Sequence, residues 1–120
     1  MESYWYLSTP FAAFEGGTQA AFALARAETR RLAVAGVRTY CPVSATYPMA
    51  RARLSVWSMR SYWYAADRPL MDGAQGLILL FAPGWMMSAA MAHEIAVFER
   101  ARKPIVPMIP GRVPASLRRA

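Results

Sequence analysis

The segment LILLFAPGWMMSAAMAHE, residues 77–94, joins an apolar run to a helical pattern through a Pro-Gly turn. Five consecutive apolar residues, 77–81, are typical of a central strand in a parallel sheet, which is buried on both faces. Ser88 is a residue type that favours the start of a helix, and the spacing that follows predicts a helix over 88–102. A buried strand, a turn and a helix in this order indicate an α/β sheet that presents its chemistry at the carboxyl ends of its strands.

Glu94 lies six residues after Ser88, at the border of the apolar stripe formed by Met91, Ile95 and Phe98. A carboxylate in that position is oriented by packing and only partly solvated, which suits a nucleophile or a general acid. The free N–H groups and partial positive charge of a helix N-terminus place the Ser88 hydroxyl well for binding an anion. The alternatives are that Ser88 is only an N-cap and that Glu94 is an ordinary surface glutamate.

Outward from this segment, apolar runs and turn residues divide the rest of the chain into further elements. We expect strands at 4–8, 37–41, 76–81 and 105–108, helices at 18–35, 57–72 and 88–102, and a long functional loop at 43–56. This order predicts a flavodoxin-like (Rossmann-like) α/β sandwich with a parallel sheet of four to five strands, occupying residues 1–109, and a basic tail at 110–120.

Details of these elements can also be predicted. Thr18 is expected to cap the first helix, whose inward residues are Phe22, Ala25, Thr29 and Leu32 and whose outward residues are Arg26, Glu28, Arg30 and Arg31. Gly36 is expected to end that helix in the left-handed conformation. The helix at 57–72 is expected to be broken near Pro69, and Pro107 indicates that the last strand is short or at an edge of the sheet.

Composition excludes several classes of protein. The 120 residues are 56% hydrophobic, yet no apolar run reaches the roughly 18 residues of a membrane span, and the N-terminus has no signal-peptide pattern. A single cysteine, Cys41, fits a reducing compartment, so we expect a cytoplasmic protein. The net charge of +7 indicates an anionic ligand or simply a solvated basic surface. Because the arginines are spread along the chain, nucleic acid is an unlikely partner.

Several short motifs, taken in order, resemble those of one family. They are Tyr6-Leu7-Ser8-Thr9-Pro10-Phe11, Cys41-Pro42-Val43-Ser44, Trp63 with Asp67, Met71-Asp72, Pro83-Gly84-Trp85 with Ser88 and Glu94, and Lys103-Pro104-Ile105-Val106. Their order and approximate spacing resemble those of nucleoside 2-deoxyribosyltransferase-like proteins. The resemblance is greatest to the small uncharacterised bacterial and phage branch that carries Pro-Gly-Trp before the site helix.

The resemblance implies specific roles for four residues. Glu94 would be the nucleophile that attacks the anomeric carbon, and Asp67 would contact the base or sugar and help protonate the departing base. Tyr6 would orient the nucleophile, and Ser88 would help bind a 5′-phosphate. Ser8, Trp85 and Asp72 are further candidates for substrate binding.

The chemistry of these residue types supports the same reaction. Cleaving a glycosidic bond requires one carboxylate near the anomeric carbon and an acid near the leaving group, and Glu94 and Asp67 can supply the pair. Alternatively, Asp67 and Asp72 are helix-end acids that pair with Arg60 or Arg68, and Tyr6 is a core aromatic residue.

No cofactor or metal is expected. The glycines form neither a dinucleotide fingerprint nor a phosphate-binding loop. The single histidine, His93, is interpreted as a structural or surface residue, and with one distant cysteine it does not make a zinc site.

The sequence therefore predicts an N-glycosidase or deoxyribosyltransferase that acts on a nucleoside, a nucleoside monophosphate or a related anionic glycoside. The alternative is a non-catalytic nucleotide-binding module of the same fold. Two departures from the family pattern indicate either a different ligand or a binding descendant: no histidines follow Cys41-Pro42, and Ala89, Ala90 and Ala92 replace glycines around Ser88. The alanines favour the binding module, whereas the retained Tyr6, Asp67 and Glu94 favour the enzyme. The aromatic residues at 62–64 also predict a homodimer or homotetramer formed through the helix around residues 57–66.

Overall fold

The computed structural model describes residues 3–12, 14–50 and 60–118. Its strands are β1 (Trp5–Ser8), β2 (Thr39–Tyr40), β3 (Gly76–Leu80) and β4 (Ile105–Met108). Its α-helices are α1 (Thr18–Val34), α2 (Pro42–Ala50), α4 (Arg60–Gly73) and α5 (Ala89–Arg100). Two short 3₁₀-helices, η1 (Trp85–Met87) and η2 (Ala115–Leu117), complete the described elements.

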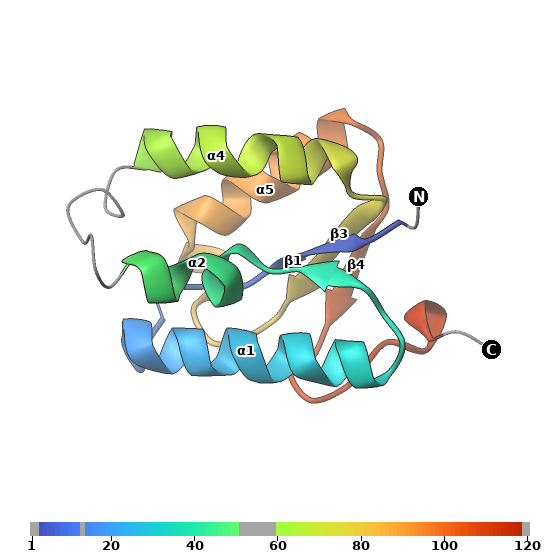
Figure 1. The fold of residues 1–120 in the computed structure, drawn as a ribbon, viewed down its shortest axis with the longest axis horizontal. Coiled ribbons are helices and arrows are strands. Elements are labelled where there is room, and N and C mark those ends of the chain that lie inside the picture. The colour runs from blue at the N-terminus through green and yellow to red at the C-terminus, as the bar shows by residue number, and fades with distance from the viewer. Residues whose placement is uncertain (1–2, 13, 51–59, 119–120) are drawn as a thin grey trace.

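The four strands form one parallel sheet in the order β2-β1-β3-β4. Helices α1 and α2 lie on one side of the sheet, and α4 and α5 lie on the other (Figure 1). All five residues of β3 are buried, as expected for a central strand. The edge position of β4 confirms the prediction from Pro107, which has no N–H to give to a further strand. The predicted fold class, a flavodoxin-like α/β sandwich, is confirmed.

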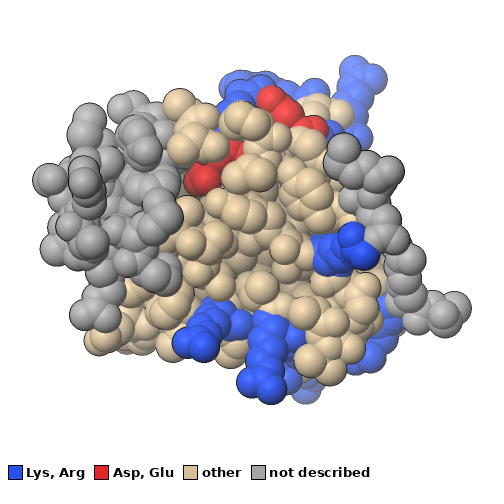
Figure 2. All heavy atoms as spheres, viewed as in Figure 1, with Lys and Arg blue, Asp and Glu red and all other residues tan. Residues whose placement is uncertain are grey.

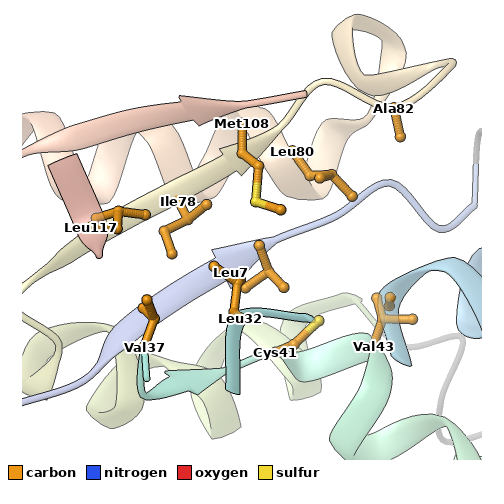
Figure 3. Close-up of a cluster of buried hydrophobic side chains, with 11 residues drawn as sticks. Leu7, Leu32, Val37, Cys41, Val43, Ile78, Leu80, Ala82, Met108 and Leu117 are labelled. Atoms are coloured by element: carbon orange, nitrogen blue, oxygen red, sulfur yellow. The ribbon is translucent and has the colours of Figure 1, made fainter. Parts of the chain in front are cut away.

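Two apolar clusters, one on each face of the sheet, make up the core. Because successive side chains of a strand point to opposite faces, Leu7 and Ile78 enter the cluster beneath α1 (Figure 3), whereas Tyr6 and Leu77 enter the cluster beneath α5. The second cluster also holds Met91 and Phe98 of α5, both fully buried. The apolar stripe predicted for this helix therefore packs on the sheet.

Two elements differ from the expectation. Helix α2 (Pro42–Ala50) takes up the first part of the loop that was expected at 43–56. Pro42 is its first residue, a position where the missing N–H has no cost and the fixed φ angle favours a helix. Helix α4 continues through Pro69 without the expected break. Pro69 has no N–H, so the carbonyl of Ala65 loses its partner within the helix. Both residues are solvent-exposed, so water can bind that carbonyl instead. Positions 51–59, which hold the rest of the expected loop and the expected start of this helix, lie outside the described residues.

Helix α1 has the expected position but not the expected outer face. Thr18 is its first residue, and Gly17 holds the N-cap position without a side-chain hydrogen bond, so the predicted cap is wrong. Glu28, expected to face solvent, is only 3% exposed. Its Oε1 accepts hydrogen bonds from the backbone N–H of Gly111 at 2.9 Å and from Arg31 Nε at 3.3 Å. The sequence alone could not place Gly111 there, because that contact spans 83 positions.

The C-terminal segment packs against the domain as far as it is described. Besides the contact between Gly111 and Glu28, Leu117 of η2 is buried in the cluster on the α1 side of the sheet (Figure 3). The residues expected to form a basic tail thus cover part of the core, from 110 to 118.

Lys103 joins the two helices that cover the second face of the sheet. Its ammonium group donates to the backbone carbonyls of Met71, Asp72 and Ala74 at 3.3, 2.6 and 2.7 Å. These carbonyls lie at the C-terminal end of α4, where helical partners are missing and a cation is favourable. Since Lys103 follows α5 by three residues, this contact fixes the end of α4 relative to α5.

Candidate functional site

A pocket of about 390 Å³ lies beyond the carboxyl end of β1, where α2, α4 and α5 approach one another. Tyr6, Asp67 and Glu94 all line it, although they come from β1, α4 and α5. The carboxyl end of a parallel strand and the start of the following helix are where α/β folds commonly bind ligands. Three of the four residues to which the resemblance gives roles therefore meet at this edge, and Ser88 is not in the pocket lining.

Glu94 is held in a fixed position in the wall of this pocket. It is 8% exposed. One carboxylate oxygen, Oε1, accepts a hydrogen bond from Ser8 Oγ at 2.5 Å, and the other, Oε2, accepts one from Tyr6 Oη at 3.2 Å. With both oxygens bound, the carboxylate can adopt few other orientations. The alternative of an ordinary surface glutamate is wrong.

The surroundings of Glu94 favour its protonated form. The pKa of Glu94 is raised to about 8, chiefly by burial; the hydrogen bonds from Ser8 and Tyr6 oppose this rise, and the nearby charge of Asp67 adds to it. A displaced pKa in a pocket is a common property of catalytic and binding groups.

Asp67 is the second acid of the pocket. Burial raises the pKa of the Asp67 carboxyl, and against a smaller lowering effect of the Tyr40 hydroxyl on β2 it reaches about 6. Asp67 is only partly buried, whereas Glu94 is almost completely enclosed, which explains why the pKa of Glu94 is displaced further. Two carboxyl groups in different environments are therefore placed to hold one proton between them at neutral pH.

Tyr6 combines a core position with a polar contact. Its ring is fully buried and lies 5.8 Å, centroid to centroid, from the rings of Phe98 and Tyr40. Burial, followed by the charges of Glu94 and Asp67, raises the pKa of Tyr6. The hydroxyl therefore stays protonated and donates to Glu94. Tyr6 is therefore both a core aromatic residue and a residue of the site.

Ser8 and Ser88 were expected to bind substrate, but in the structure both hydroxyls contact other groups of the protein. The fully buried Ser8 uses its hydroxyl to bind Glu94. The Ser88 hydroxyl accepts a hydrogen bond from the backbone N–H of Met91 at 3.2 Å, which confirms Ser88 as the N-cap of α5. Ser88 is buried and does not line the pocket, and a phosphate-binding role for it stays a prediction.

Trp85 and Asp72 lie away from the pocket. Trp85 is in η1, after a turn in which Gly84 adopts the left-handed conformation with φ of 86°, and its ring stacks on Phe81 at 4.4 Å. Asp72 is exposed and accepts a hydrogen bond from Arg68 Nε at 3.0 Å. The alternative of a helix-end ion pair is thus the one that the structure shows for Asp72.

Three aromatic residues near the pocket were not predicted from the sequence to belong to the site. His93 and Tyr64 line the pocket and stack face to face, with ring centroids 3.8 Å apart and an interplanar angle of 3°. Burial, and the charges of Arg68 and Arg100, lower the pKa of His93, so the ring is neutral at pH 7. The third, Tyr40, influences the pKa of Asp67. The position of His93 next to Glu94 was a signal for its proximity to the pocket, but Tyr40 lay in no motif.

The distribution of charge on the surface agrees with the absence of a dense basic run. On the face shown in Figure 2, Lys and Arg side chains lie along the upper and lower edges and at one place to the right, acidic side chains lie in the upper part, and uncharged residues occupy most of the centre. Within residues 3–12, 14–50 and 60–118, no three His, Cys, Asp or Glu residues are grouped as metal ligands. No helix in the same ranges is both long and apolar enough to span a membrane.

These features define an α/β protein of flavodoxin-like fold whose pocket holds a buried acid and a second, partly buried one. The family described as domain of unknown function DUF1937 matches residues 3–109, and the chain belongs to this family. A search of curated proteins finds no match.

Proposed function

We propose that this protein is an N-glycosidase or deoxyribosyltransferase that acts on a nucleoside, a nucleoside monophosphate or a related anionic glycoside, with Glu94 as nucleophile. The observation that carries the proposal is the fixed carboxylate of Glu94, bound through both oxygens and lining the same pocket as Asp67. This pair fits the requirement of glycosidic cleavage for one carboxylate at the anomeric carbon and one acid at the leaving group.

In the first step, an oxygen of ionised Glu94 attacks the anomeric carbon as the bond to the base nitrogen breaks. Asp67 gives its proton to the departing base, and a glycosyl ester of Glu94 remains. In the second step, water or a second base attacks the same carbon and releases Glu94, while Asp67 takes up the proton. Ser8 and Tyr6 hold Glu94 in place throughout, since their hydroxyls bind both of its oxygens.

The rest of the pocket suits a flat, uncharged ring beside a sugar. Phe11 and the stacked rings of Tyr64 and His93 provide aromatic surface in the wall. A volume of about 390 Å³ is within the usual range for small-molecule sites. In the proposed complex, the base contacts this aromatic surface and the sugar lies over Glu94.

A non-catalytic nucleotide-binding module is the second candidate, and two observations favour it. With a pKa of about 8, most of Glu94 is protonated and not nucleophilic at neutral pH in the empty pocket. Ala90, at a position where the resembling family has glycine, lines the pocket and occupies space there.

The two candidates are separated by incubating the protein with ribonucleosides, 2′-deoxynucleosides and their 5′-monophosphates, each with and without a second free base. Chromatography detects released base and exchanged nucleoside, and calorimetry on the same panel detects binding. Release or exchange supports the enzyme. Binding of a nucleotide without release of base supports the module and contradicts the enzyme.

The pH dependence of the proposed reaction follows from the two acids. The reactive form needs Glu94 ionised and Asp67 protonated, so kcat/KM is expected to rise through about pH 6 and fall above about pH 8. Glu94 has the higher pKa of the two acids, yet it is the one that must be ionised. The reactive form is therefore only roughly 1% of the protein near pH 7. Initial rates between pH 4.5 and 9.5 test this, and a rate that is constant from pH 5 to 9 contradicts it.

We also propose that the protein forms a homodimer or homotetramer. Exposed apolar side chains on the described surface, including Met86 and Met87 at 77% and 80% exposure, provide area that association would cover. Light scattering at micromolar concentration is expected to give at least twice the monomer mass. A monomer mass at that concentration contradicts the proposal.

A further inference from the structure

His93 lines the pocket, but the proposed reaction gives its ring nitrogens no part. It lies on α5 between Ala90 and Glu94, and all three residues line the pocket. Residues three and four positions apart lie on one side of a helix, so these residues form the wall that α5 gives to the pocket. The imidazole of His93 therefore belongs to the same wall as the carboxyl group of Glu94.

The ring of His93 is held by Tyr64 of α4. The two rings lie face to face, with centroids 3.8 Å apart and planes 3° from parallel. The hydroxyl of Tyr64 donates to the backbone carbonyl of Ala89 at 3.5 Å, which joins the tyrosine to the start of α5. Because Tyr64 covers one face of the imidazole, a ligand can reach only the other face and the edge, where the two ring nitrogens lie.

The ring nitrogens of His93 differ from the hydroxyl groups of the pocket in having no protein partner. The lining holds four hydroxyl groups, and each contacts another group of the protein. These contacts are Tyr6 with Glu94, Thr9 with Cys41, Thr46 with the carbonyl of Pro42, and Tyr64 with the carbonyl of Ala89. Among residues 3–12, 14–50 and 60–118, neither ring nitrogen of His93 has a hydrogen-bond partner. Both nitrogens are therefore left for a ligand.

A neutral imidazole suits a heterocyclic ligand. Burial and the charges of Arg68 and Arg100 lower the pKa of His93, so at pH 7 one ring nitrogen donates a hydrogen bond and the other accepts one. The edge of a nucleobase also carries both donors and acceptors, so it can bind either nitrogen. A phosphate only accepts hydrogen bonds and is better matched by a charged donor. The chemistry of His93 therefore fits the base of a ligand.

We propose that His93 is a specificity-determining residue, which hydrogen-bonds through its ring nitrogens to the edge of a heterocyclic base bound in this pocket. This inference rests on the proposed function for the nature of the ligand as a base-bearing compound. Stacking on aromatic side chains tolerates every base, because each base has a π face. A hydrogen bond to the edge distinguishes bases, since a base without the matching group leaves the imidazole unpaired.

The chain has one histidine, so ¹⁵N labelling of histidine gives one pair of ring-nitrogen resonances in NMR. Ribonucleosides and 2′-deoxynucleosides of the common bases are added at pH 7, and calorimetry identifies those that bind. The Glu94→Gln protein is used for any nucleoside that the wild type cleaves. Binding is expected to separate the two resonances, because the ligand selects one tautomer of the imidazole. Resonances that stay unchanged at saturation overturn the proposal.

His93→Phe tests the effect on specificity. Phenylalanine keeps a ring that can stack on Tyr64 but has no ring nitrogens. The affinity for the preferred nucleoside is expected to fall about 10-fold, and the ratio between the tightest and the weakest binding nucleosides to fall by a similar factor.

Tyr64→Phe is the matched control, because it keeps the stacked ring and the imidazole and removes only a hydroxyl that already contacts Ala89. It is expected to leave the affinities and their ratio within about twofold of the wild type. An equal loss of affinity for every nucleoside in His93→Phe, or the same change in Tyr64→Phe, would show a structural role and overturn the proposal.

The outcomes separate this role from the proposed function. If the ring-nitrogen resonances separate and no base is released by the wild type, the proposed enzyme fails and the role of His93 stands. If base is released and the resonances do not change, the role of His93 fails and the proposed enzyme stands. If no nucleoside of the panel binds or is cleaved, both are overturned.

Discussion

Glu94→Gln is expected to lower the release of base by about 10⁴-fold while leaving ligand affinity within a few-fold of the wild type. Glutamine keeps the shape of the side chain, and its amide can still bind the hydroxyls of Ser8 and Tyr6. It cannot form the glycosyl ester, however, because it has no ionised oxygen. Single-turnover release of base and calorimetric titration of the same ligand measure the two quantities.

Glu99→Gln is the control for this substitution. Glu99 lies on the same helix, α5, and is solvent-exposed, so the same change of charge there is expected to leave release of base unaltered. Equal rates of release in the wild type and in Glu94→Gln would show that Glu94 is not the nucleophile.

The free energy of unfolding is expected to fall as the pH rises from about 4.5 to about 8. Burial raises the pKa of Glu94 to about 8, so over this interval the native protein keeps a proton that the unfolded chain has released. This stabilisation is complete at a pH below the pKa that Glu94 has in the unfolded chain. It is lost as the pH rises to the pKa that Glu94 has in the native protein. The slope for one proton is about 1.4 kcal/mol per pH unit, and Asp67 adds a contribution of the same sign below about pH 6.

Urea denaturation at pH 5, 6, 7 and 8 measures this dependence. Glu94→Gln is expected to be less sensitive to pH between 6 and 8 than the wild type, because glutamine does not titrate. Glu99→Gln is expected to keep the wild-type slope, since its side chain is exposed. A Glu94→Gln variant with the full wild-type slope would show that the buried proton is on another group.

Local patterns in the sequence were sufficient for the central part of the fold. The apolar run of β3, the turn at Pro83-Gly84 and the spacing of Met91 and Phe98 each depend on neighbours in sequence, and the structure confirms all three. The border position of Glu94 on that helix also indicated a buried acid. Helix α2 was missed because its residues were assigned to a loop, although Pro42 at the first position of a helix is favourable.

Contacts between distant segments were not available from the sequence. Glu28 was expected at the surface because its own helix places it beside arginines, yet Gly111 covers it from the far end of the chain. The influence of Tyr40 on the pKa of Asp67 was missed for the same reason, since Tyr40 comes to this edge of the sheet only through the pairing of β2 with β1. Asp72 was assigned to the site by resemblance, and its exposure and its bond to Arg68 could be seen only in three dimensions.

The two hydroxyls that hold Glu94 have a consequence for how the chain finds its native sheet. Tyr6 and Ser8 are two positions apart on β1, so both point to the same face, while Leu7 points into the apolar cluster on the other. If β1 slipped by one residue, Leu7 would meet the carboxyl group of Glu94, and both hydroxyls would enter an apolar layer without partners. Glu94, the acid proposed for catalysis, thus also favours the native register of β1. Without its carboxyl group, the free-energy difference between the native register and a shifted one would be smaller.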